Sequence, residues 1–137
     1  MPAPRKMPLI VTGSVKTSVA KAVIKPGSGR VTINGYPAEN WLYDPYRMLA
    51  LTPVTLLPEQ FKEVDVDVKV SGGGHASQAR AVMQALARSI TNWTRSSSVR
   101  NLFRDFDRHL LSGDPRRKEP KKFGGPRARK RFQKSYR

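Results

Sequence analysis

Apolar and polar residues alternate most regularly over residues 64–70, and this pattern predicts a β-strand. Val occupies every second position, whereas Asp65, Asp67 and Lys69 stand between, so the valines face a core and the polar side chains face away. Runs rich in β-branched residues predict further strands earlier in the chain. These strands cover residues 9–12, 18–25 and 30–33.

Two stretches beside these strands are typical of tight turns. Residues 26–29 read Pro-Gly-Ser-Gly, and Asn34-Gly35 follows the strand over 30–33. Glycine adopts the positive φ that tight hairpin turns require. Both stretches therefore predict hairpin turns, and the first would join the strand over 18–25 to the strand over 30–33.

Helical periodicity begins after the glycine triplet at 72–74 and predicts a helix from about residue 75 to 93. Its apolar face would carry Ala79, Met83, Leu86, Ile90 and Trp93, and its polar face Arg80, Gln84 and Arg88. Three serines at 96–98 can cap a second short helix that carries Val99, Leu102, Phe103 and Phe106. Between residues 37 and 58, four prolines predict several short helices in place of one long helix.

The order of these elements indicates one α+β domain, a four-stranded sheet with packed helices, over residues 9–113. Residues 1–8 are expected to be a flexible N-terminus. Residues 114–137 hold 11 Lys and Arg, two acidic residues and no Leu, Ile, Val or Met. Such a segment cannot bury enough apolar surface to offset its ordering entropy. We therefore expect an extended basic C-terminal tail that a partner orders.

The charge of the whole chain predicts a polyanionic partner. It holds 26 Lys and Arg against 10 Asp and Glu, a net charge of +16, and its pI is about 11.0. Neutralising phosphates with such side chains releases condensed counterions, so nucleic acid is the expected partner. An acidic membrane surface is the competing polyanion, although no apolar run could span a bilayer. The chain starts without a signal-peptide stretch, and its prolines oppose the helix of a mitochondrial presequence.

Metal, redox and catalytic chemistry lack the residues they need. The chain has no cysteine and two histidines, which excludes a disulfide framework and leaves a metal centre short of ligands. The candidate acids and bases are His75, His109, Asp65, Asp67, Asp105 and Asp107. No pattern brings them together, so we predict no enzyme, no cofactor and no small-molecule substrate.

Gly73, Gly74 and His75 form a candidate phosphate contact, because glycines let backbone N–H groups approach an anion and a helix N-terminus favours negative charge. No Gly-Lys-Ser/Thr follows, so binding of a nucleoside triphosphate is not predicted. A plain strand-to-helix turn is the structural alternative.

Basic and aromatic residues are interleaved over residues 127–137. Arginine grips phosphate with two parallel hydrogen bonds, and Phe132 or Tyr136 can stack on a base or ribose. The basic groups at 116–118 and 121–122 extend this stripe upstream. The alternative is a solvated tail or a localisation signal.

Three stretches carry a resemblance to a known family. They are residues 18–35 with Pro-Gly-Ser-Gly-Arg-Val-Thr-Ile-Asn-Gly, residues 66–78 with Val-Ser-Gly-Gly-Gly-His, and residues 114–137 with Lys-Lys-Phe-Gly-Gly-Pro and the ending Gln-Lys-Ser-Tyr-Arg. In order and spacing the chain resembles the universal small-subunit ribosomal protein nine family, which the older eukaryotic naming calls sixteen. The ending is similar to the cytosolic eukaryotic form.

The resemblance implies a sheet-and-helix fold like the second domain of ribosomal protein S-five, seated on the head of the cytoplasmic small (40S) ribosomal subunit. It implies a structural role in translation, with 18S rRNA and neighbouring head proteins as partners. The tail would approach the anticodon stem-loop of the peptidyl-site tRNA through Lys134, Tyr136 and Arg137. A free-standing basic nucleic-acid-binding protein, or a membrane-associated one, is the alternative.

The expected rRNA contacts follow from charge, from the glycine turn and from this resemblance. In the domain they are Lys16, Lys21, Lys25, Arg30, Gly73, Gly74, His75, Arg80 and Arg88, of which a subset would face RNA. In the tail they are Arg116, Arg117, Lys118, Lys121, Lys122, Arg127, Arg129, Lys130 and Arg131.

Overall fold

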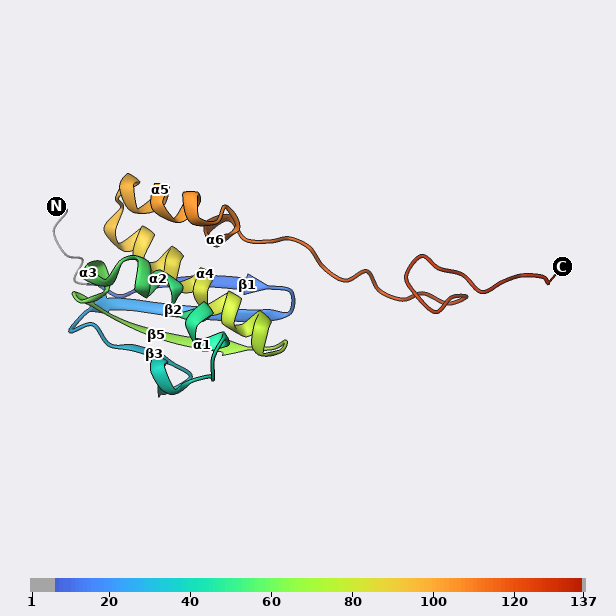
Figure 1. The fold of residues 1–137 in the computed structure, drawn as a ribbon, viewed down its shortest axis with the longest axis horizontal. Helices are drawn as coiled ribbons and strands as arrows, with labels where there is room; N and C mark the ends of the chain where they lie inside the picture. Colours follow the sequence, from blue (N-terminus) through green and yellow to red (C-terminus); the bar gives the residue numbers. More distant parts are fainter. Residues whose placement is uncertain (1–6, 137) are drawn as a thin grey trace.

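Five strands form a single sheet in the order β1-β2-β5-β3-β4 (Figure 1). The computed structural model describes residues 7–136. The strands are β1 Leu9–Val15, β2 Ser18–Pro26, β3 Val31–Ile33, β4 Tyr36–Pro37 and β5 Val64–Ser71. Four of them confirm predicted strands. The fifth, β4, has two exposed residues and no apolar alternation, so the predicted count of four is one short.

The turn after β2 does not form the predicted hairpin. Strand β5 lies between β2 and β3, antiparallel to the first and parallel to the second. The four valines of β5 are thereby buried at the centre of the sheet. The second predicted hairpin is confirmed, because Ile33 pairs with Tyr36 around Asn34 and Gly35, whose φ angles are 53° and 83°.

Helices cover one face of this sheet and follow most of the predicted segments. They are η1 Ala38–Asn40, α1 Tyr46–Ala50, α2 Thr52–Leu56, α3 Pro58–Phe61, α4 His75–Thr94, α5 Ser97–Phe106 and α6 His109–Ser112. The short helices between the prolines and the long α4 are confirmed. Helix α5 begins after Ser96 as expected, although the Ser96 hydroxyl contacts Ser98 Oγ and makes no capping bond to the backbone. Helix α6 was not predicted.

The predicted polar face of α4 is wrong for two of its three residues. Gln84 is buried and Arg88 is half-buried, because β1 and α6 pack against that side of the helix. The close approach depends on Gly13, where a Cβ atom would lie 2.8 Å from the carbonyl oxygen of Ala81. Gln84 remains hydrogen-bonded, since its Oε1 accepts the backbone N–H of Ser14 at 2.7 Å.

The chain beyond α6 contains neither helix nor strand over residues 113–136 and runs away from the domain (Figure 1). The apolar core receives its last residues from α6, Leu110 and the partly buried Leu111. Among the described helices none is long and apolar enough to cross a membrane.

Candidate nucleic-acid interface

One end of the sheet gathers several predicted RNA-binding residues. Lys16 lies in the turn between β1 and β2, and the glycine turn between β5 and α4 is next to it because Val19 of β2 pairs with Ser71 of β5. We call this region the loop end. It comprises Lys16, Gly73, Gly74, His75 and Arg80, all of which are exposed.

Backbone conformation and packing require glycine at two positions of the turn between β5 and α4. Gly72 and Gly73 have φ angles of 81° and 63°, and a Cβ atom on Gly73 would clash with the buried Ser18 hydroxyl. The Ser18 hydroxyl donates to the carbonyl oxygen of Gly72 at 2.9 Å. Gly74 is different, because a Cβ atom there would have no neighbour within 4 Å. The structure thus explains two glycines by packing, while Gly74 and the first-turn N–H groups of α4 lie at an open surface.

Three aromatic rings lie beside this turn. The ring of His75 is 6.1 Å from those of Tyr43 and Tyr46, and the two tyrosine rings are 5.4 Å apart. Tyr43 is 62% exposed, so one ring of the cluster is open to a stacking partner. Sequence reasoning missed the tyrosines, since the segment over 37–58 shows little periodicity.

A groove connects the loop end to the start of the tail. Arg80 and Arg116 both line it, together with Val15 and Asp114. The backbone N–H and Nε of Arg116 donate to Asp114 at 3.0 and 2.8 Å. These bonds hold the pKa of the Asp114 carboxyl well below its usual range. Asp114 and Arg116, the first residues of the tail, thus lie in the same groove as Arg80.

Lys25 and Arg30 lie at the opposite end of the sheet from the loop end, because β2 and β5 are antiparallel. The loop that presents Arg30 is held by Asp65, whose Oδ1 accepts the backbone N–H groups of Ser28, Gly29 and Arg30 at 3.0, 3.1 and 2.9 Å. The bond from Arg30 contributes most to lowering the pKa of Asp65. The backbone N–H groups of this glycine-rich loop are thus bound to a carboxylate of the same domain.

Lys21 lies on the open face of the sheet, opposite Lys69 of the neighbouring strand. Arg88 is occupied within the domain, where its Nε donates to the carbonyl oxygen of Leu111 at 2.7 Å and its Nη1 to that of Thr12 at 3.0 Å. Burial lowers the pKa of the Arg88 guanidinium. The structure therefore gives Arg88 a role in joining β1, α4 and α6, which sets it apart from the exposed basic residues.

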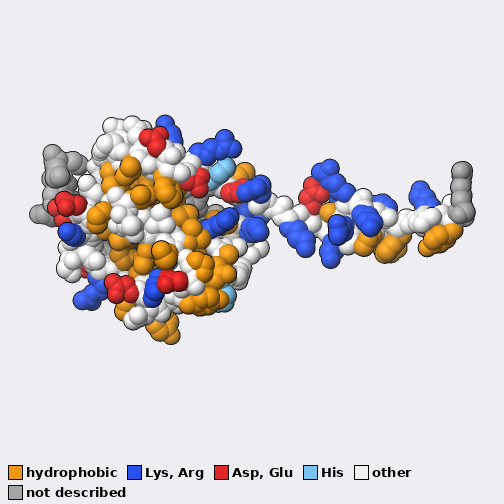
Figure 2. Space-filling model, in the orientation of Figure 1, with side chains coloured by type: hydrophobic (Ala, Val, Ile, Leu, Met, Phe, Trp, Pro, Cys, Tyr) orange, Lys and Arg blue, Asp and Glu red, His pale blue; other side chains and the backbone are white. Residues whose placement is uncertain are grey.

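The tail carries its basic residues on an exposed chain with few acidic neighbours (Figure 2). Arg129 donates twice to Glu119, at 2.9 and 2.8 Å, and lowers the pKa of that carboxyl. The backbone N–H of Phe132 donates to the carbonyl oxygen of Gly124 at 3.1 Å and closes a loop. The exposed basic residues are Arg116, Arg117, Lys118, Lys121, Lys122, Arg127, Arg129, Lys130, Arg131 and Lys134.

The tail also exposes its aromatic side chains. Phe132 is 66% and Tyr136 87% exposed. Arg137, the third residue expected near tRNA, lies outside the described residues. The side chains that would stack on a base are thus uncovered by the domain.

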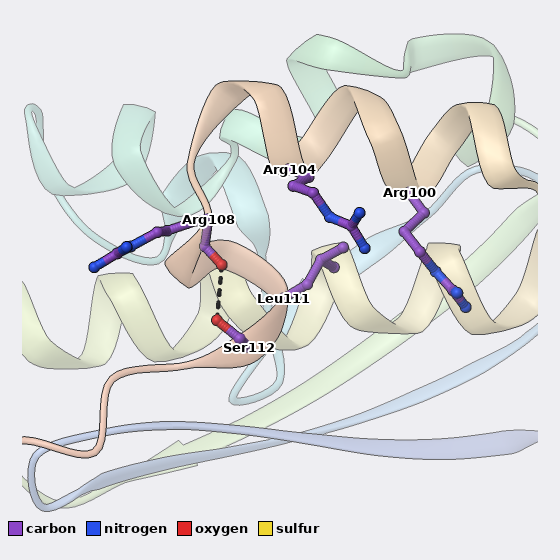
Figure 3. A pocket seen from close by; sticks show the side chains of 5 residues that line it. All are labelled: Arg100, Arg104, Arg108, Leu111 and Ser112. Carbon is purple, nitrogen blue, oxygen red and sulfur yellow. Dashed lines mark hydrogen bonds between the residues drawn. The ribbon is translucent and has the colours of Figure 1, made fainter.

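Sequence reasoning missed a second basic surface, shown in Figure 3. Arg100, Arg104 and Arg108 line one pocket with Leu111 and Ser112. Arg95 and Arg100 line the neighbouring pocket. The spacing of four residues within the predicted helix was the available signal, because side chains four apart share a helix face.

Several of the candidate acids and bases have structural partners within the domain. No group of three or more metal-binding side chains lies together within residues 7–136. Asp65 holds the 28–30 loop, and Asp67 accepts the Thr32 hydroxyl at 2.9 Å. His109 Nδ1 lies 3.1 Å from the carbonyl oxygen of Gly113. Asp65 and His109 thus hold loops, and Asp67 joins β5 to β3.

Comparisons with known proteins match almost the whole chain to a single family. The family model described as ribosomal protein S9/S16 matches residues 13–137. A protein of Desulfurococcus amylolyticus named small ribosomal subunit protein uS9 is 50% identical over 129 residues, which cover 94% of this chain and 92% of the relative. Proteins of the same name from Pyrobaculum aerophilum and Methanothrix thermoacetophila are each 47% identical, over 94% and 92% of this chain and 91% and 96% of the relatives.

Proposed function

Since the chain belongs to the ribosomal protein S9/S16 family, we propose that it is a structural constituent of the small ribosomal subunit and binds the subunit's rRNA. The family is one of structural proteins and not of enzymes. Its relatives are named as small-subunit proteins, which supports the same particle for this chain. The relatives named above are archaeal, so a eukaryotic origin, and with it 18S rRNA as the particular ligand, stays a prediction.

The RNA proposal rests mainly on one observation: the basic tail takes no part in the apolar core of the domain. The apolar core is completed by α6, whereas 11 of the 26 basic residues follow within the last 24 positions. A segment that adds nothing to the core is not retained for the stability of the domain. Its arginines and lysines are instead free to neutralise phosphates, and the released counterions offset the cost of ordering it.

The loop end supports a second part of the proposal, an anchor where the tail leaves the domain. Lys16, Arg80 and Arg116 bring three cations to this end, and the open N-terminus of the 20-residue α4 adds backbone N–H groups. Tyr43 beside His75 offers a ring for an unpaired base. Lys21, Lys25 and Arg30 lie elsewhere on the sheet and would reach other phosphates.

The finer placement rests on the family resemblance. We infer that the domain sits on the head of the subunit among other head proteins, and that Lys134, Tyr136 and Arg137 approach the anticodon stem-loop of peptidyl-site tRNA. Phosphate contacts position a ligand without reading its bases, so such a tail would hold every tRNA alike. Substitution of Lys130 and Arg131 tests the contact of the tail with rRNA, and removal of residues 135–137 tests its contact with tRNA.

The contribution of the tail to rRNA binding can be measured by removing two of its cations and comparing the effect with the removal of two cations from the domain. We expect K130Q/R131Q to reduce the slope of log affinity for small-subunit rRNA against log salt by about 1.5, since each phosphate contributes about 0.7 to 0.9. The control K62Q/K69Q removes the same charge from two exposed lysines of the domain, Lys62 beside the 28–30 loop and Lys69 opposite Lys21, and should reduce the slope by clearly less than the tail variant. Equal losses in the two variants would mean that the tail makes no particular contact.

A free-standing nucleic-acid-binding protein makes a different prediction. It would bind an rRNA fragment, duplex DNA and acidic vesicles with similar affinity, and it would not sediment with small subunits. Our proposal expects preference for the rRNA and co-migration with the subunit in a sucrose gradient.

A further inference from the structure

Four arginines lie along α5 and its two flanking turns, where they line two adjoining pockets. Arg100 belongs to both pockets described above, so it connects Arg95 on one side to Arg104 and Arg108 on the other. We call this set the arginine track. All four side chains are exposed, and none of them takes part in a salt bridge among the described residues. In Figure 3, Arg100 and Arg104 both point from α5 toward the side where Leu111 lies.

The track is not explained by the folding of α5. Like charges four residues apart repel and destabilise a helix, and Arg100 and Arg104 have this spacing. A solvated helix face would normally intersperse acidic residues. Asp105 follows Arg104 but is turned about 100° around the helix axis, and Asp107 is engaged with the backbone N–H of His109 at 2.9 Å. Repulsion along the track would be relieved by an anionic ligand laid across it.

We propose that the arginine track is a second RNA-binding surface, which holds the phosphates of an rRNA strand other than the one the tail follows. This inference rests on the proposed ribosomal function and deepens it. The track starts beside α6, after which the tail begins, and follows α5 to Arg95 at the other end of that helix, whereas the loop end lies at the turns of the sheet (Figure 1). The protein would thus join two separate RNA segments through one rigid body.

The chemistry of the track favours phosphate over an acidic protein segment. All four cations are arginines, whose planar fork pairs with two oxygens of one phosphate. Four residues of helix rise by about 6 Å, which is on the order of the spacing between neighbouring phosphates on one strand. The exposed apolar side chains of α5, Leu102 and Phe106, lie on a side of the helix roughly opposite to the arginines. The apolar residues that line the two pockets, Leu111 and Leu9, are only partly exposed, so a protein partner docked on the track would find little apolar surface to bury.

The absence of cysteine from the sequence allows a direct test in the assembled subunit. A single cysteine at Asn101, exposed on α5 beside Arg100, carries a tethered iron chelate that cleaves nearby RNA by hydroxyl radicals. Ser135→Cys carries the same probe in the tail, and Lys62→Cys provides a domain control. We expect the Asn101→Cys probe to cleave rRNA at nucleotides that the other two probes do not reach. No cleavage from Asn101→Cys, or cleavage at the same nucleotides as Ser135→Cys, would overturn the proposal.

A binding measurement gives a readout that does not depend on the probe. Relative to wild type, the full-length variant R100Q/R104Q should lose about 1.5 from the salt slope for rRNA, and the control K62Q/K69Q should lose clearly less. R100K/R104K should keep the slope but bind more weakly, because lysine lacks the fork. Circular dichroism and the melting temperature confirm that each variant is folded.

The outcomes separate the track from the tail. If R100Q/R104Q binds RNA like the wild type while K130Q/R131Q is impaired, the track inference fails and the proposed function stands. If R100Q/R104Q binds RNA normally but fails to enter complete subunits, the track contacts an acidic protein, and the RNA assignment is overturned. If neither variant changes binding, the proposed function fails as well.

Discussion

The loop between β2 and β3 depends on one carboxylate, and replacing Asp65 tests that reasoning. Its Oδ1 accepts three backbone N–H groups, from Ser28, Gly29 and Arg30. An Asp side chain that caps a helix by accepting a backbone N–H contributes about 1 kcal/mol to stability. Because three donors converge on one partly exposed oxygen, we expect Asp65→Ala to cost about 2 kcal/mol of unfolding free energy. For a domain of this size that corresponds to a fall in Tm of about 10 °C.

The matched control is Asp67→Ala on the same face of β5. Asp67 accepts one side-chain bond, from the Thr32 hydroxyl at 2.9 Å, so its loss should cost well under half as much. Urea unfolding followed by circular dichroism measures both variants. Equal costs for the two, or a cost below about 0.5 kcal/mol for Asp65→Ala, would refute the view that Asp65 holds the loop.

The pH dependence of stability gives an independent check. Hydrogen bonds lower the folded pKa of Asp65 below its ordinary value of 3.8. The stabilisation is therefore fully present above the unfolded pKa and is lost as pH falls through the folded one. Wild type should lose this contribution below about pH 4, whereas Asp65→Asn should show a shallower decline there. An unchanged acid profile in Asp65→Asn would contradict the assignment.

Three further predictions concern the glycine turn, Arg88 and the end of the tail. Gly73→Ala should cost about 1 to 3 kcal/mol because of its positive φ and the clash with Ser18 Oγ, whereas Gly74→Ala, in open space, should change stability little; thermal unfolding compares them. Arg88→Gln should lower unfolding free energy by about 1 to 3 kcal/mol while leaving the salt slope of rRNA binding intact, because the guanidinium bonds carbonyls of its own domain. Removing residues 135–137 should leave subunit assembly intact and weaken retention of peptidyl-site tRNA, and unchanged tRNA affinity of purified truncated subunits would count against that contact.

The elements that sequence patterns predicted are those with a strong local signal. The alternating valines of β5, the period of α4 and the Asn34-Gly35 turn all specify their structure within a few residues. The hairpin expected at 26–29 failed for a non-local reason. Its turn residues suit a tight loop, but the loop bends around Asp65, 35 positions beyond Arg30, and β5 lies between the strands.

The sequence patterns also did not predict that part of the polar face of α4 is buried. Arg80, Gln84 and Arg88 share a helix face, yet β1 and α6 cover only part of it. Gln84 and Arg88 fit there because backbone carbonyls and N–H groups of those elements satisfy their polar atoms. Helix α6 spans four residues and gave no periodic signal, so the covering layer could not be foreseen. The family resemblance identified the partner class, but it did not reveal the arginine track, which requires the position of α5.

The tail's internal contacts must yield if RNA is to order it, and their strength decides whether this is feasible. Arg129 and Glu119 form a bidentate pair, yet both side chains are at least half exposed, and solvent screens such surface pairs so that they add little to stability. A phosphate offers Arg129 the same two-pronged geometry, with gain from released counterions. Exchange of the carboxylate for a phosphate is therefore favourable, and the loop closed by Phe132 and Gly124 is easily remodelled. Glu119→Gln should then raise the affinity for rRNA slightly at low salt, because it removes the competing anion, and a loss of affinity in that variant would show that the pair belongs to the bound form.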